Sequence, residues 1–184
     1  MSEYVFSRKP FGLGSNVKGN KSYFENSITL FGSQGISYLN EHDVVANKNL
    51  IEKWKVIMSK TSAEHAGQSD KDGKKKVVSR IEVLAPNVIC TESYLLLSVF
   101  EYEVEALNMK SYVQTRFFRF LLSTILLTQN IAKDKFQFIP HQDFTITSDI
   151  DWSKSVADID RQLYAKYGLS DEEVAFIESM IKVM

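Results

Sequence analysis

The stretch NMKSYVQTRFFRFLLSTILLTQNIAKDKFQFIPHQDF, from Asn108 to Phe144, predicts the structural centre of this chain. Its first part, 109–127, carries eleven apolar side chains. That density is too high for a surface helix with one apolar stripe, and it predicts a single long helix buried on most sides. Arg116 and Arg119 share the one polar line left on this helix. We expect these arginines to pair with acids or carbonyls at the edge of the core.

A polar break at 128–130 and a short strand at 136–139 are expected to follow the helix. Upstream, short runs rich in β-branched and aromatic residues predict strands, of which 94–100 (YLLLSVF) is apolar enough to be central. The remaining expected strands are 27–31, 53–58, 77–84 and 88–91.

Two helices are expected near the C-terminus. The first covers 156–167 and is closed by Gly168, and the second begins at a capping box in which Ser170 is the N-cap and Glu173 is at N3. The predicted fold is α+β: a twisted mixed or antiparallel sheet from roughly 27–100, packed on the long helix, with a C-terminal helical pair. We divide the chain into 1–144, an α+β domain, and 145–184, an acidic helical appendage.

Charge is distributed unevenly along the 184 residues. Residues 1–136 hold 18 Lys and Arg against 14 Asp and Glu, whereas residues 137–184 hold 4 against 9. The net charge of the whole chain is −1, so no global field draws it to a polyanion or a membrane. On charge alone, this asymmetry fits either a polyanionic partner that meets the first part of the chain or solvent-exposed faces that are unevenly charged.

The chain has a single cysteine, Cys90, in an apolar setting, which excludes an internal disulfide and predicts a buried small side chain. No signal-peptide pattern is present at the start, and the most apolar segment is too short to span a bilayer. We expect a cytoplasmic protein with no membrane partner.

Catalytic and metal-binding patterns are weak. His42, His65 and His141 lie in three unrelated polar contexts, so no metal site is expected. Asp72 and Lys74 have the D-x-K spacing of some metal-dependent nucleases, but they lie in a polar loop without a matching upstream acid. A metal-dependent nuclease is kept as a minor alternative.

Cations on loops that project from the sheet are the remaining candidates. The segment 59–76 is long and polar and ends in three lysines, and the loop 8–21 is also basic. Lysine and arginine neutralise phosphates, while Asn16, Gln34, Ser69 and similar side chains read base edges. The basic segment 53–60, with Lys53 and Lys55, is a further candidate. The side chains that we predict to bind DNA are Lys9, Lys18, Lys21, Lys60, Gln68, Lys74, Lys75, Lys76 and Arg80.

An ordered series of short motifs resembles a known family. Its pieces, in chain order, are SRKPFG (7–12), KWKV (53–56), TESYL (91–95), QNI (129–131), FIP (138–140), IDRQLY (159–164) and YGLS (167–170). This series resembles the C-terminal target-recognition region of adenine-specific DNA methyltransferases from bacterial restriction-modification systems, and is similar to the recognition domains of type I specificity subunits.

The chain departs from this family in its catalytic half. Such methylases carry an (Asn/Asp)-Pro-Pro-(Tyr/Phe) tetrad, whereas the prolines here are Pro10, Pro86 and Pro140. The resemblance thus implies a recognition domain without activity or cofactor of its own. Double-stranded DNA and a methylase or restriction catalytic domain, in cis or in trans, would be its partners, with S-adenosylmethionine bound by the missing half. A protein-interaction or assembly module, docking through the apolar face of 174–184, is the main alternative.

Overall fold

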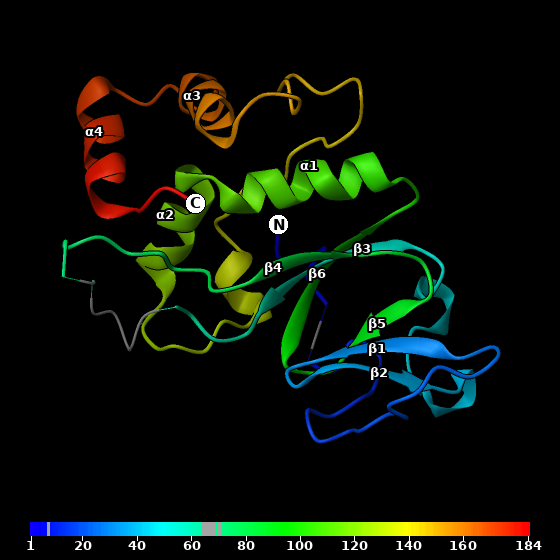
Figure 1. Cartoon of the computed structure of the whole chain (residues 1–184). Helices are drawn as coiled ribbons and strands as arrows, with labels where there is room; N and C mark the ends of the chain where they lie inside the picture. Colours follow the sequence, from blue (N-terminus) through cyan, green and yellow to red (C-terminus); the bar gives the residue numbers. More distant parts are fainter. Residues whose placement is uncertain (7, 64–68, 70) are drawn as a thin grey trace.

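The computed structural model describes residues 1–6, 8–63, 69 and 71–184, and within them six strands form two three-stranded sheets (Figure 1). In the first sheet β1 pairs antiparallel with β2 and parallel with β5, and in the second β3 lies antiparallel between β4 and β6. The fold is α+β as predicted, but the expected single sheet is divided in two. The strands are β1 (Ile28–Gly32), β2 (Gly35–Leu39), β3 (Trp54–Ser59), β4 (Ile81–Leu84), β5 (Val88–Cys90) and β6 (Tyr94–Phe100).

Strands β3 and β6 lie between two hydrophobic cores. Because side chains alternate between the faces of a strand, Leu95 and Leu97 of β6 enter one core while Leu96 enters the other. In β3, Met58 and Ile57 divide in the same way. This double burial explains why 94–100 reads as a continuous apolar run.

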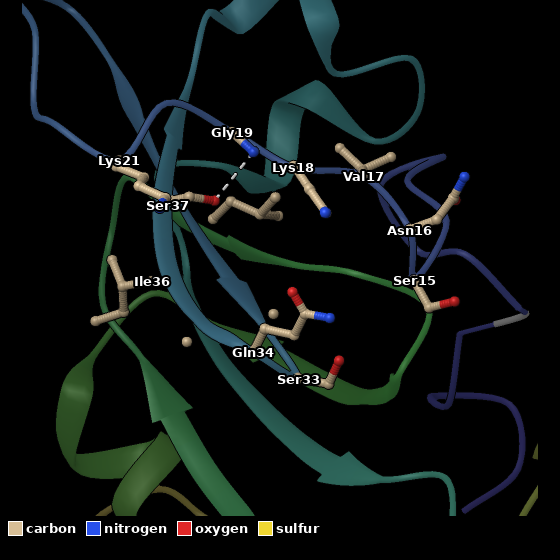
Figure 2. A pocket seen from close by; sticks show the side chains of 13 residues that line it. Ser15, Asn16, Val17, Lys18, Gly19, Lys21, Ser33, Gln34, Ile36 and Ser37 are labelled. Carbon is tan, nitrogen blue, oxygen red and sulfur yellow. Dashed lines mark hydrogen bonds between the residues drawn. The ribbon is translucent and has the colours of Figure 1, made fainter.

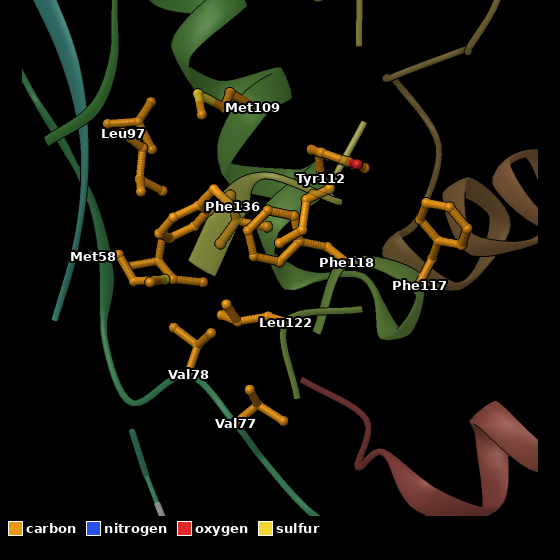
Figure 3. Packing of buried hydrophobic residues seen from close by; sticks show 14 of the residues in the cluster. Met58, Val77, Val78, Leu97, Met109, Tyr112, Phe117, Phe118, Leu122 and Phe136 are labelled. Atoms are coloured by element: carbon orange, nitrogen blue, oxygen red, sulfur yellow. The ribbon is translucent and has the colours of Figure 1, made fainter. Parts of the chain in front are cut away.

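Within the described ranges there are four α-helices, of which α1 lies across the second sheet while α3 and α4 are farther out and pack on other helices (Figure 1). Their side chains fill the larger core, where Met109 and Tyr112 of α1 meet Phe118 and Leu122 of α2 (Figure 3). The elements are α1 (Glu103–Gln114), α2 (Arg116–Ile125), α3 (Val156–Lys166), α4 (Asp171–Met180), and the short 3₁₀ helices η1 (Glu41–Asp43), η2 (Lys48–Leu50) and η3 (Lys133–Phe136).

The prediction of a single helix over 109–127 is wrong, because the helix is interrupted at Thr115. This residue is extended (φ −62°, ψ 152°) and caps α2, its Oγ1 accepting the Phe118 N–H at 3.1 Å. The Asp160 carboxylate of α3 accepts the N–H groups of Arg116 and Phe117, each at 2.9 Å. Two acceptors therefore satisfy the first amides of a new helix.

Two further predictions about strands fail. Residues 136–139 form the end of η3 and a turn, in which Phe136 and Ile139 both enter the core three residues apart. That spacing belongs to a helical turn rather than to a strand. Strand β2 was not predicted, since it lies at a sheet edge and exposes Gly35 and Ile36, which leaves it no inward-facing apolar pattern.

The strand expected over 77–84 begins only at Ile81, because a tight turn precedes it. Val77 has φ +69°, which is rare for a β-branched residue, and the Val78 N–H donates to the Lys76 carbonyl at 2.9 Å. This γ-turn points the Lys76 carbonyl at α2, where the Arg119 Nη1 donates to it at 3.1 Å.

Arg119 is fully buried and connects three segments. Its guanidinium donates to the carbonyls of Gln114 and Thr115 at the start of α2, to Lys76, and at 2.7 Å to Lys182 near the C-terminus. Arg116 forms an ion pair with Glu178 of α4 at 2.7 Å. The expectation that these arginines bind carbonyls and acids is confirmed.

The C-terminal helices begin and end as their local signals predict. Gly168 follows α3 with φ +66°, and both hydrogen bonds of the Ser170–Glu173 capping box are present. Ile159, Leu163 and Ile177 join the same core as the second sheet. Residues on both sides of the proposed 144/145 boundary thus share one hydrophobic cluster.

Lys55, one of the surface cations considered from the sequence, is instead fully buried. Its Nζ donates to the carbonyls of Leu50, Ile51 and Lys53 at 3.2, 2.6 and 2.6 Å and so caps the end of η2. Burial lowers the pKa of Lys55 to about 8 from an ordinary 10.5, so this lysine is structural rather than a contact for a partner.

This lowered pKa predicts a pH-dependent stability. Between about pH 8 and pH 10.5 the unfolded chain keeps the Lys55 proton and the folded chain has released it, so folding stability gains with rising pH. Urea unfolding at both ends of this window should show the free energy of unfolding of the wild type rising relative to that of Lys55→Met. An unchanged difference between the two proteins would show that Lys55 keeps its ordinary pKa.

Candidate nucleic-acid interface

Two hollows in the surface share an edge and form one polar surface. The smaller, of about 180 Å³, lies between the N-terminal loop and the β1–β2 hairpin, and the larger, of about 460 Å³, lies beside the ends of β3 and β6. Ser15 and Ser33 line both, so we call them together the polar hollow. Its polar and charged lining consists of Arg8, Ser15, Asn16, Lys18, Lys21, Ser33, Gln34, Ser37, Ser59, Lys60, Thr61, Ser79, Glu92, Ser93, Tyr94 and Asn130.

The β1–β2 hairpin brings amide groups to this surface. Its two-residue turn, Ser33–Gln34, lies between the paired residues Gly32 and Gly35, so Gln34 is at the tip of the hairpin. Figure 2 shows the Gln34 amide and the Lys18 side chain reaching toward one another across the smaller hollow. Gln34 and Lys18 therefore line the same hollow.

The loop that carries Lys18 and Lys21 is fastened to β2. Asn20 pairs with Tyr38 through two backbone hydrogen bonds of 2.7 and 2.9 Å, and the Gly19 N–H donates to the Ser37 Oγ at 3.2 Å (Figure 2). A Cβ at position 19 would lie 2.6 Å from the Tyr38 carbonyl oxygen, so only glycine allows this approach. The two lysines thus extend from a fixed backbone.

Glu92 fastens the start of the loop. Its carboxylate accepts the Arg8 Nε–H at 2.9 Å and the Ser15 N–H at 3.3 Å, while its own N–H donates to the Leu13 carbonyl at 2.9 Å. The hydrogen bond from Arg8 holds the pKa of Glu92 below its usual 4.5. Glu92 is therefore ionised at neutral pH and holds Arg8 at the edge of the hollow.

Cations are crowded in the larger hollow. Burial lowers the pKa of Lys60, and the positive charges of Arg8 and Lys9 lower it further while Glu92 opposes them. An anion bound between these cations would relieve the repulsion that contributes to the lowered pKa of Lys60. Arg80 lies nearby over the Phe31 ring, 4.7 Å from its centroid, and donates to Glu82 at 2.9 Å.

The lysine run at 74–76 lies against the C-terminal segment rather than in the hollow. Lys74 Nζ donates to the Glu178 carbonyl at 3.2 Å, and the Lys75 backbone bonds to Met180 and Lys182 at 2.8 and 3.0 Å. Lys76 Nζ donates at 3.4 Å to the carbonyl of Ser79, a residue at the margin of the hollow. Gln68, the remaining candidate, lies outside the described residues.

The sequence did not indicate several residues of the hollow. Asn130 reaches it because the Ile131 N–H donates to the Lys60 carbonyl at 2.7 Å and Thr61 pairs with Asn130. This pairing joins segments about seventy positions apart, and no local sequence pattern predicts it. Arg8 was part of a loop recognised as basic, yet its pairing with Glu92 depends on the folded chain.

Comparison of the chain with protein-family models, curated proteins and solved structures finds no match in any of the three. Among the described residues, no group of three or more His, Cys, Asp or Glu is placed to hold a metal ion. No helix within these same ranges is long and apolar enough to cross a bilayer.

The contact of Glu92 with the loop predicts a measurable local effect. Glu92→Gln keeps the shape but removes the charge that holds Arg8, so the Ser15 amide should exchange faster with solvent, as measured by NMR. The Gly19 amide, bonded to Ser37, is the internal control and should keep its rate.

Because the folded pKa of Glu92 is lowered, this contact contributes stability above pH 4.5 and loses it as the pH falls through the folded pKa. The stability difference between wild type and Glu92→Gln should therefore shrink on acidification. Equal Ser15 exchange in the two proteins at neutral pH would contradict the assignment.

Proposed function

We propose that this chain is the DNA target-recognition domain of a restriction-modification methyltransferase and lacks the catalytic half. The polar hollow carries the proposal, because it combines cations, amides and hydroxyls from chain segments far apart in sequence on one surface. It would hold double-stranded DNA by its phosphates and read base edges in the major groove.

Phosphate binding is supported by the cations around the hollow. Lys18, Lys21 and Lys60 line it, and Arg8 and Lys9 lie close enough to Lys60 to depress its pKa. A phosphate placed among them would relieve this repulsion and release counterions from the duplex. Such contacts fix the position of a protein on DNA without reading its sequence.

Base reading is supported by the amide side chains beside these cations. Gln34 at the hairpin tip, Asn16 and Asn130 are exposed and line the hollow. A glutamine or asparagine amide can form two hydrogen bonds with the N6 and N7 of adenine, and a β-ribbon fits the width of the major groove. Gln34 is accordingly our first choice for a base contact.

The family resemblance and the charge distribution support an orientation in which the first part of the chain faces the DNA. The hollow is built from residues of 1–136, which carry a net charge of +4, whereas residues 137–184 carry −5. The acidic C-terminal segment, which includes α3 and the acidic helix α4, would face away from the duplex. Methyl transfer, with S-adenosylmethionine, would belong to a catalytic domain that shares the grip on DNA.

Salt titration tests the proposal. Fluorescence anisotropy with a labelled duplex, from about 50 to about 200 mM salt, should show affinity falling steeply as salt rises. Lys60→Ala removes one phosphate contact and should lower the slope of log affinity against log salt by about 0.9.

The matched control is Lys154→Ala, at an exposed site in the segment before α3. This variant should keep the affinity and the salt slope of the wild type. Binding that does not depend on salt, or equal slopes for Lys60→Ala and the wild type, would overturn the proposal.

A further inference from the structure

An apolar groove lies between α2 and α4, away from the polar hollow. It has a volume of about 480 Å³ and is lined by Phe117, Phe120 and Leu121 of α2, by Glu172, Glu173, Phe176 and Ile177 of α4, and by Leu169, which precedes α4. No residue of this lining belongs to the polar hollow. The groove is thus a separate feature of the surface.

The groove has a fixed floor and an exposed wall. Phe117 and Ile177 are buried in the larger core, so the floor is formed before any ligand arrives. Phe176, in contrast, is 56% exposed, and its ring meets Phe120 edge-on with 5.9 Å between centroids. Covering this aromatic wall would remove apolar surface from water.

The rim of the groove is negatively charged. Glu172 and Glu173 line it, Asp171 precedes them in the first turn of α4, and among the described residues no Lys or Arg belongs to the lining. Arg116, at the start of α2, already pairs with Glu178. An occupant with apolar side chains on one face and cations along its flank would match both features.

We propose that this groove binds a basic amphipathic helix of a partner protein. Helices of this type place side chains at i, i+3, i+4 and i+7 into apolar grooves between helices. The apolar face would pack on Phe120 and Phe176, and lysines or arginines at its edge would approach Glu172. The proposal does not depend on DNA binding, since the two surfaces share no residue.

A synthetic peptide tests the groove directly. The probe is a fluorescein-labelled 18-residue helix of leucine and lysine with leucine on one face, and its counterpart replaces every lysine by glutamate. The leucine–lysine helix should bind the wild-type chain at least about tenfold more tightly than the leucine–glutamate helix.

Variants locate the binding. Phe176→Ala should weaken the leucine–lysine helix about tenfold, because the exposed aromatic anchor is lost. Glu172→Gln should weaken it about two- to fivefold and reduce its salt dependence. Ile146→Ala, at a fully exposed apolar side chain outside the groove, is the matched control and should bind as the wild type does.

The proposal would be overturned if the two peptides bound equally well, or if Ile146→Ala and Phe176→Ala lost the same peptide affinity. It would also be overturned if sedimentation showed a dimer that Phe176→Ala abolishes, because a second copy of this chain would then be the occupant. Lys60→Ala should bind the peptide normally, so failure of DNA binding and failure of peptide binding are told apart.

Discussion

The buried guanidinium of Arg119 is the interaction on which the arrangement of the C-terminal half depends. Its donors bind carbonyls from three segments: the start of α2, the residue before the Val77 turn, and the chain after α4. Arginine suits this position because its planar group offers five donors in a fixed geometry. Asp160 completes the arrangement by accepting the first two amides of α2. Replacing Arg119 would leave these carbonyls without their donor, and an unsatisfied buried polar group is destabilising.

This network also holds the lysine run at 74–76 away from the polar hollow. It fastens the lysine run at 74–76 to the chain end beside α4, while the polar hollow forms around the β1–β2 hairpin on the other side of β3 and β6. Figure 1 shows α4 and the hairpin at opposite ends of the molecule. The two proposed ligands, a duplex in the hollow and a helix in the α2–α4 groove, would therefore not compete for the same residues.

Elements that are determined by neighbouring residues in the sequence could be predicted from it. The apolar run of β6 matches its strand residue for residue, and the Ser170–Glu173 capping box starts α4 as expected. The break at Thr115 could not be read in this way, because the carboxylate that completes it comes from Asp160, 44 positions from Arg116. The sequence likewise predicted Lys55 to be a surface cation, because the three carbonyls that accept its hydrogen bonds come together only in the folded chain.

The candidate site likewise has some features that the sequence predicts and others that appear only in the folded chain. Basic and amide side chains of the loop 8–21 and of the hairpin were evident from composition, whereas the pairing of Thr61 with Asn130 and the contact of Arg8 with Glu92 required the folded chain. Lysine footprinting with an acetylating reagent, with and without duplex DNA, tests the account most directly. It predicts that DNA protects Lys18, Lys21 and Lys60 more strongly than Lys74 and Lys75. Protection confined to Lys74 and Lys75, or no protection at the hollow, would contradict it.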